Sequence, residues 1–290
     1  MFTPSIALSL LVNQKGPGIG SMMLSKRGDV EMMYVPLGKF VMGSTIEDDE
    51  QPVRNVFLNS YWMGRNDVTV GQFANYCQAT GYQFRWNQQP ATYWKSDHPM
   101  VNVTWLEAKQ FCRWAGGDLP TEAQWEKAAR GTDARNFPWG NVWDPTRGWF
   151  NSNQRCQNPS QLAINTVPVG SFSTGVSPYG CLDMAGQTFN WCSDFFDDKY
   201  DPKETKNPTG PKQGSLRVVR GGSWFAQPNL FRCAYRGNGS PDNPKFSPFG
   251  FRIAYRADSY SAFKLMSIIS KATHRPNDPQ KAVRSSIPPN

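Results

Sequence analysis

The sequence lacks several features that would assign the chain to a common functional class. No apolar run in its 290 residues approaches the roughly 20 residues that a membrane-crossing helix needs, so we expect no transmembrane segment. It has no glycine-rich phosphate loop, no Gly-x-Ser-x-Gly elbow and no paired zinc-ligand motif. Its two histidines, His98 and His274, are too few for a three-histidine metal site within one chain.

Glycine, proline and aromatic residues are plentiful, and positive charge is concentrated near the C-terminus. With 25 glycines, 23 prolines and 13% aromatic residues, the composition favours a loop-rich α+β domain. The net charge is +8, and residues 256–290 hold six basic residues against two acidic ones. This basic tail could bind a protein partner, a nucleic acid or an anionic surface. It could also be a solvated extension that only keeps the protein soluble.

Local signals predict three helices and several short strands. Thr69, Thr104 and Thr121 each precede a Gln or Glu by three residues, the spacing of a capping box at a helix start. Glycines 81 and 116 are expected to end the first two helices. Strand-like runs occupy residues 33–42, 56–63, 216–219 and 251–255, and the Pro- and Gly-rich stretch 136–176 is expected to be loop.

A series of motifs resembles one protein family. The most informative is Gly221-Gly222-Ser223-Trp224, which follows Arg220 and is continued by the arginine-rich residues 232–236 and 250–254. Seven further landmarks lie in order at residues 33–44, 68–73, 98–105, 119–131, 137–141, 167–172 and 179–186. Together they resemble the formylglycine-generating-enzyme, or sulfatase-modifying-factor, domain family.

The resemblance implies a loop-rich α+β fold of the C-type-lectin-like kind, with small twisted sheets and a few short helices. It implies a domain at residues 31–256, an N-terminal extension at 1–30 and a basic C-terminal extension at 257–290. Within the domain we expect Trp224 to be buried, and Arg220 and Arg252 to have structural roles, holding carbonyls or carboxylates beneath the surface.

The resemblance also implies where a catalytic site would lie. Catalytic members hold copper with two cysteines after the Gly-Gly-Ser segment, one about three residues past the Ser and one five residues later. Copper(I) prefers such thiolates, but here Ala226 stands at the first position and no cysteine precedes Cys233. We therefore expect no copper site, and whether the chain is an enzyme at all stays open.

The calcium sites of the resembled family look degraded in this chain. The segment that would supply one site has Gln187 and Asn190 where the family has Asn and Glu, and the second site would draw on Asn151. Amides and carbonyls without a carboxylate bind calcium weakly. We expect no cofactor, with calcium at these three residues as a weak alternative.

The cysteines favour a reducing compartment. In family members from oxidising compartments, the positions of Cys112 and Cys233 pair with positions that here hold Ile253 and Ala129. A bridge between Cys181 and Cys192 stays open, but reduced, buried thiols are the simpler reading. Localisation inside the cell or an organelle is expected, although secretion is not excluded. The acidic runs 47–50 and 194–198 are expected to be solvated or paired with surface arginines.

We hypothesise that the chain is a non-catalytic binding or scaffolding protein, a subunit or adaptor of a larger assembly. A protein partner is expected to bind through the N- and C-terminal extensions. Ligand or partner contacts are expected on the exposed loop face, at Phe225, Gln227, Asn229, Phe231, Asn238, Asp242 and Phe246. The alternatives are a metal-dependent oxidoreductase with an unrecognised site, or a ligand-binding protein diversified by a retroelement.

Overall fold

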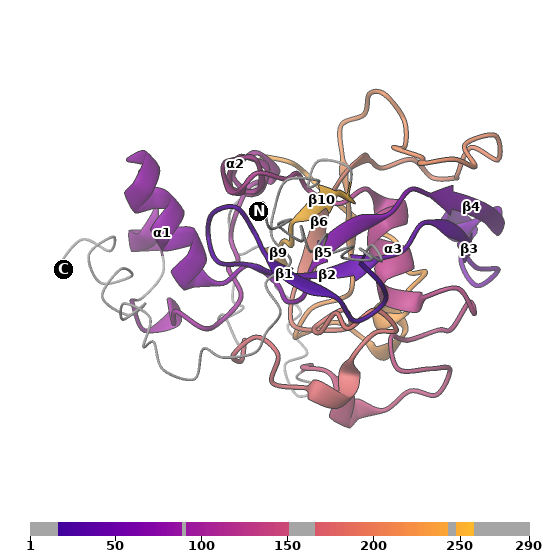
Figure 1. Cartoon of the computed structure of the whole chain (residues 1–290), viewed down its shortest axis with the longest axis horizontal. Coiled ribbons are helices and arrows are strands. Elements are labelled where there is room, and N and C mark those ends of the chain that lie inside the picture. Colours follow the sequence, from indigo (N-terminus) through magenta and orange to yellow (C-terminus); the bar gives the residue numbers. More distant parts are fainter. Residues whose placement is uncertain (1–16, 89–90, 151–165, 243–247, 258–290) are drawn as a thin grey trace, which may run out of the picture.

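Short strands and three helices form the domain in the computed structural model, which describes residues 17–88, 91–150, 166–242 and 248–257 (Figure 1). One sheet has the order β1-β2-β5-β10 and is antiparallel throughout. A second has the order β8-β7-β6-β9, in which β6 and β9 run parallel. The strands β3 and β4 form a separate antiparallel pair.

The strands and helices are short. The strands are β1 Met22–Leu24, β2 Glu31–Val35, β3 Gly38–Met42, β4 Arg54–Leu58, β5 Tyr61–Gly64, β6 Phe189–Phe195, β7 Arg217–Arg220, β8 Gly237–Gly239, β9 Phe249–Gly250 and β10 Ala254–Arg256. The helices are α1 Val70–Thr80, α2 Trp105–Ala115 and α3 Glu122–Arg130. Single 3-10 turns include η1 Asp48–Glu50 and η7 Pro228–Phe231. The α+β class implied by the resemblance is thus confirmed.

All three predicted helix starts are confirmed. Thr69, Thr104 and Thr121 each accept a hydrogen bond from the backbone N–H three residues on, and the Gln or Glu at that position bonds back to the cap. The first helix ends at Gly81 and the second at Gly116, both in the left-handed conformation that glycine adopts freely.

The predicted strands differ from the observed ones in several places. The expected runs 33–42 and 56–63 are each divided into two strands, β2 with β3 and β4 with β5, which belong to different sheets. The expected strand 251–255 is wrong for its first half, because β10 begins only at Ala254. The side chain of Arg252 instead occupies the interior, where it donates to four backbone carbonyls, to Asp67 and to Asn190. At the other end, β1 lies before residue 31 and pairs with β2, so the sheet begins earlier in the chain than the predicted domain does.

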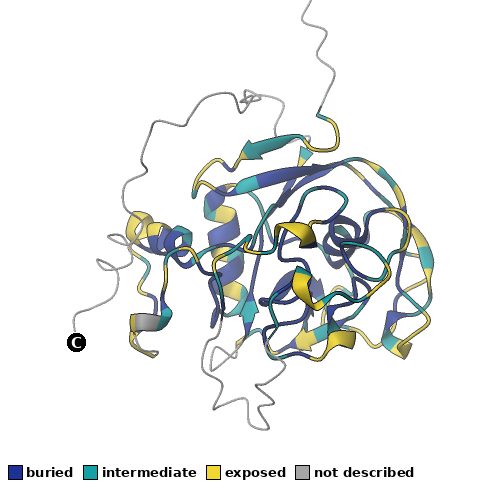
Figure 2. Ribbon diagram, turned by 90° about the horizontal axis from the view of Figure 1, so that it is seen from below, coloured by how far each residue is buried: buried dark blue, intermediate teal, exposed yellow. Residues whose placement is uncertain are grey.

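Buried residues lie on the inner faces of these elements (Figure 2), and the apolar side chains among them form the core. One cluster joins α1 and α2, through Phe73 and Phe111, to Trp191 of β6 and to Phe251. Another joins α3, through Trp125, to the first sheet and to β3 and β4. Among the described residues, no helix is long and apolar enough to span a membrane.

The Gly-Gly-Ser-Trp segment lies inside this body. Gly221 and Gly222 have φ angles of 96° and 75°, which an L side chain rarely adopts. A Cβ on Gly222 would also collide with the ring of Phe231. The predicted burial of Trp224 is confirmed, since the residue is 3% exposed.

Replacing Trp224 with Ala should therefore lower the free energy of unfolding by about 3 to 5 kcal/mol, as for other buried aromatic residues. Gln227, three residues on, is exposed, and Gln227→Ala should change stability by less than about 0.5 kcal/mol. Urea unfolding of both variants measures the difference. Equal losses would show that Trp224 does not anchor this segment.

Candidate functional site

A broad open groove lies over the segment that follows the Gly-Gly-Ser-Trp motif. Its volume is about 1170 Å³. Its walls come from residues 46–49 around η1, from Phe225, Asn229 and Leu230 around η7, from residues 235–240 including β8, from residues 198–199, and from the start of β9. Segments far apart in the sequence thus meet around one hollow.

Aromatic rings form the floor of the groove. Phe189 of β6 contacts Tyr235 and Phe249, with ring centroids 6.5 Å and 6.0 Å away. Strand β8 covers part of this ring cluster, because a Cβ on Gly239 would lie 2.6 Å from the Phe249 ring and 2.7 Å from the ring of Trp191, which is fully buried. Glycine at this position therefore lets the backbone pack on the rings. Tyr235 and Phe249 are only partly buried, so they supply the apolar surface that the groove offers to an occupant.

Carboxylates form the rim. Glu47, Asp48 and Asp49 line one side and Asp198 lines the groove from another segment, whereas Lys199 is the exposed cation among the described lining residues. Burial raises the pKa of Asp49, although Arg236 opposes the shift. The pKa of Tyr235 is also raised, first by burial and then by Asp49 and Glu47. The groove is therefore acidic, although the whole chain is basic.

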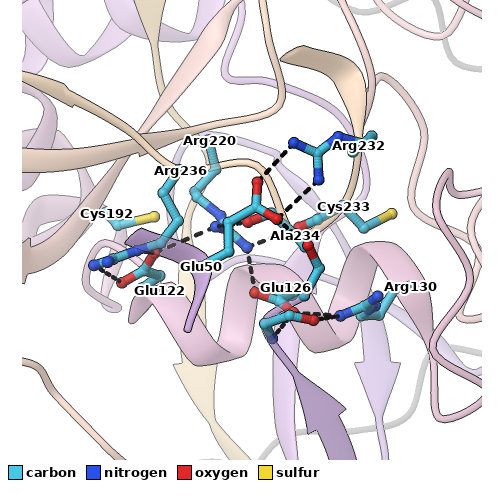
Figure 3. A network of polar contacts seen from close by, with 12 residues as sticks. Glu50, Glu122, Glu126, Arg130, Cys192, Arg220, Arg232, Cys233, Ala234 and Arg236 are labelled. Carbon is cyan, nitrogen blue, oxygen red and sulfur yellow. Dashed lines mark hydrogen bonds and ion pairs between the residues drawn. The ribbon is translucent and has the colours of Figure 1, made fainter. Parts of the chain in front are cut away.

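Arg236 holds the two sides of this rim together. Its guanidinium donates to both carboxylate oxygens of Glu122 (Figure 3), at 2.7 Å and 3.1 Å. The remaining nitrogen donates to the backbone carbonyls of Asp49, at 2.6 Å, and of Asp197, at 2.9 Å. Because its side chain is only 2% exposed, Arg236 serves mainly to position the rim.

The network continues below Arg236 into helix α3 (Figure 3). Arg220 donates to Glu126 and, at 3.3 Å, to Glu122, and it also donates to the carbonyls of Cys233 and Ala234. Burial disfavours its charged form, but the attractions of Glu126, Tyr200 and Glu122 together raise its pKa. Burial alone would raise the pKa of Glu122, but Arg236 and Arg220, with the hydrogen bonds that Glu122 accepts, together lower it. These predicted contacts of Arg220 are confirmed.

The expectation that the acidic runs are solvated or paired with surface arginines is wrong at two positions. Glu50 is fully buried and accepts two hydrogen bonds of 2.8 Å from Arg232, which is itself 6% exposed. Asp194 is 4% exposed and accepts from the backbone N–H of Glu122 at the start of α3. Both pairings join segments far apart in the sequence, so the local run of charges could not reveal them.

Three of the seven predicted contact residues line the groove: Phe225, Asn229 and Asn238. Gln227 and Asp242 are exposed but do not line it. Phe231 is 1% exposed and stacks on Trp143, with ring centroids 5.3 Å apart, so it cannot reach a surface ligand. Phe246 lies outside the described residues. The sequence analysis did not predict the aromatic floor of the groove or its carboxylate rim. One signal was available for the floor, because the alternation Gly237-Asn238-Gly239 is typical of a strand whose backbone packs closely on other groups.

The residues at the position implied for copper do not fit that metal. Ala226 and Phe231, five residues later, belong to one apolar cluster with Phe137 and Ala185. Neither side chain carries a donor atom, and copper(I) needs soft donors. In the described ranges, no group of three or more His, Cys, Asp and Glu side chains is placed to hold a metal ion.

The residues implied for calcium are engaged elsewhere. The Oδ1 atom of Asn190 accepts from Trp125, at 2.9 Å, and from the Arg252 guanidinium, at 2.8 Å. Gln187 exchanges two hydrogen bonds with the backbone of Val167. A cation next to Arg252 would be repelled, so this pair does not fit calcium. Asn151 lies outside the described residues.

The described cysteines and His98 have structural surroundings. Cys77, Cys112, Cys181, Cys192 and Cys233 are free and buried. Burial raises the pKa of the Cys181 thiol to about 11 and of the Cys233 thiol to about 12, which makes both poor nucleophiles. His98 is 7% exposed, and its Nδ1 lies 2.9 Å from Thr166 Oγ1.

Comparison with known proteins identifies the family. The model of the sulfatase-modifying factor enzyme 1-like domain matches residues 22–257. The chain belongs to this family. It is 31% identical to the formylglycine-generating enzyme of Streptomyces coelicolor, over 83% of this chain and 93% of that protein. It is 34% identical to the serine/threonine-protein kinase pkn1 of Chlamydia caviae, over 77% of this chain but only 38% of the length of that relative.

Solved structures confirm the fold. PvdO from Pseudomonas aeruginosa superposes with a TM-score of 0.69 at 24% identity, covering 83% of this chain and all of that chain. The variable protein 1 of Treponema denticola superposes with a TM-score of 0.63 at 23% identity, covering 81% of this chain and 98% of that chain. These likenesses establish the sulfatase-modifying-factor fold of the domain.

The buried carboxyl of Asp194 predicts a pH dependence of stability. Burial and the neighbouring Glu122 raise its pKa to about 7, whereas an unfolded Asp titrates near 3.9. The folded state therefore binds this proton more tightly, so the stabilisation is complete below about pH 4 and is lost as the pH rises towards about 7.

Asp194→Asn should remove this loss. The difference in the free energy of unfolding between the variant and the wild type should therefore shift by about 2 kcal/mol in favour of the variant from about pH 5 to about pH 7. Urea unfolding at both pH values measures the change. Asp242→Asn, at an exposed position, is the control and should leave the pH profile unchanged. If the free energy of unfolding of Asp194→Asn changed with pH in the same way as that of the wild type, the raised pKa of Asp194 would be contradicted.

Proposed function

We propose that the chain is a non-catalytic binding protein of the sulfatase-modifying-factor family, and that its groove binds a basic segment of a protein partner. The observation that carries this proposal is the combination of an aromatic floor with four rim carboxylates, next to the residues that follow the Gly-Gly-Ser-Trp segment. A cationic side chain with an apolar stem fits such a site, because its head meets the carboxylates while its stem covers the rings.

The apolar replacements at the implied copper position support the non-catalytic part of the proposal. Ala226 and Phe231 pack with other apolar side chains, so the residues next to the groove supply shape rather than metal ligands. The free, buried thiols are consistent with a reducing compartment, which we propose for the protein. The residues that flank the matched domain, before residue 22 and after residue 257, are proposed to contribute further partner contacts.

A basic peptide should bind the groove through its rim. We expect a fluorescent peptide of alternating arginine and tyrosine to bind the wild type, and the double variant Asp48→Asn/Asp198→Asn to raise its Kd about 2- to 30-fold, the effect of losing two exposed ion pairs. Fluorescence anisotropy titration at low salt measures the change.

Two controls accompany this titration. Asp201→Asn removes an exposed carboxylate that does not line the groove and should leave the Kd unchanged. A glutamate-tyrosine peptide of the same length should bind no variant. If Asp201→Asn weakens binding as much as the rim variant does, the peptide is attracted by overall charge and the groove is not its site.

An oxidation assay tests the proposal that the chain is non-catalytic. Incubation of the purified chain with copper, oxygen and a cysteine-containing sulfatase-type peptide should yield no more aldehyde than copper and peptide alone. Mass spectrometry of the peptide measures this. Turnover above that control, lost in Cys233→Ser, would favour the alternative of an oxidoreductase with an unrecognised site.

A further inference from the structure

A second hollow lies where the described chain ends. It measures about 510 Å³ and is lined by Leu37, by residues 57–60, by Thr121 and Gln124 of the α3 start, by residues 207–209, and by Arg256. Leu37 on its lip is 63% exposed, which is unusual for a leucine at the edge of a hollow. The other accessible apolar side chain on its described lining is Phe57, and the polar lining residues include no carboxylate. Leu37 and Phe57 therefore form an uncovered apolar edge on an otherwise polar hollow.

The described chain ends beside this hollow. β10 pairs antiparallel with β5, and Arg256 lies opposite Tyr61. The N–H of Ala257 then donates to the carbonyl of Ser60, at 3.3 Å. On the facing segment, the residues before Ser60 are Asn59 and Leu58, and both of them line the hollow.

The sequence that follows supplies a matching segment. Residues 263–269 read Phe-Lys-Leu-Met-Ser-Ile-Ile, an apolar run with one charge. It begins six residues after Ala257, and six extended residues span up to about 20 Å. The remainder of the tail, from residue 271 onward, is polar and basic.

We propose that residues 263–269 dock in the hollow of their own chain, covering Leu37 and Phe57. The tail would then leave the domain at a fixed point, with its basic residues 271–290 beside the surface. This proposal concerns a different surface from the groove and does not depend on the binding function proposed for it.

The short connection favours the chain's own segment over a second copy. A flexible tether of a few residues holds its end at an effective concentration on the order of millimolar, far above that of a second molecule in dilute solution. The acidic groove is the less suitable place for this run, because its rim offers charge where the run offers methyl and aromatic groups.

Hydrogen exchange measured by mass spectrometry on the full chain tests the proposal. Peptides covering residues 57–60 and 205–209 should exchange roughly fivefold more slowly in the wild type than in a chain truncated after Ala257. The full-length variant Phe263→Ser/Ile268→Ser should lose the same protection, and so should Leu37→Ser. Leu106→Ser, at a leucine that is 54% exposed on α2 and does not line the hollow, should keep it.

The outcomes separate the possible occupants. Protection that is independent of protein concentration and lost in both the tail variant and Leu37→Ser supports the proposal. Protection that grows with protein concentration would identify a second copy as the occupant and overturn it. Equal exchange in the wild type and the tail variant would also overturn it, because nothing in the tail would then cover the hollow.

Discussion

The contact of Arg236 with Glu122 is the interaction on which the groove depends. The groove gathers carboxylates from two loops that would repel each other if nothing held them, and Arg236 binds the backbone of both loops while its charge is satisfied by Glu122. A buried charge is tolerated only when it is paired and fully hydrogen-bonded. Here the pairing is supplied by the first turn of α3, where a carboxylate is also favoured by the helix dipole.

Local features of this fold could be read from the sequence, because their causes are local. A capping box needs two residues three apart, and all three boxes were predictable from Thr69, Thr104 and Thr121. The network beneath the groove could not be predicted in the same way, because Arg236 and Glu122 are 114 positions apart and Arg232 and Glu50 are 182 apart. Nothing in the spacing of charges says which carboxylate an arginine reaches after folding.

The candidate site was predictable to an intermediate degree. Phe225, Asn229 and Asn238 do line the groove, because the chain leaves the core after Gly-Gly-Ser-Trp, but their role in binding stays a prediction. The prediction failed at Phe231, whose aromatic ring could belong to a surface or to a core. The structure decides the question through Gly222: the absence of a side chain there leaves space that the Phe231 ring fills, so this aromatic residue packs inward.

The charge of the groove is set by the buried pairs as much as by the rim. Arg220, Arg232 and Arg236 lie beneath or beside it, yet each is matched by Glu126, Glu50 or Glu122, so the network adds little net charge. The buried arginines therefore do not cancel the negative electrostatic potential of the rim carboxylates, and a cleft with low-dielectric walls concentrates that potential. Four of the chain's eight excess positive charges come from residues 256–290, so the net charge of the chain does not describe the groove. The sign of the groove follows from the carboxylates that line it, and the net charge alone would have suggested the opposite sign.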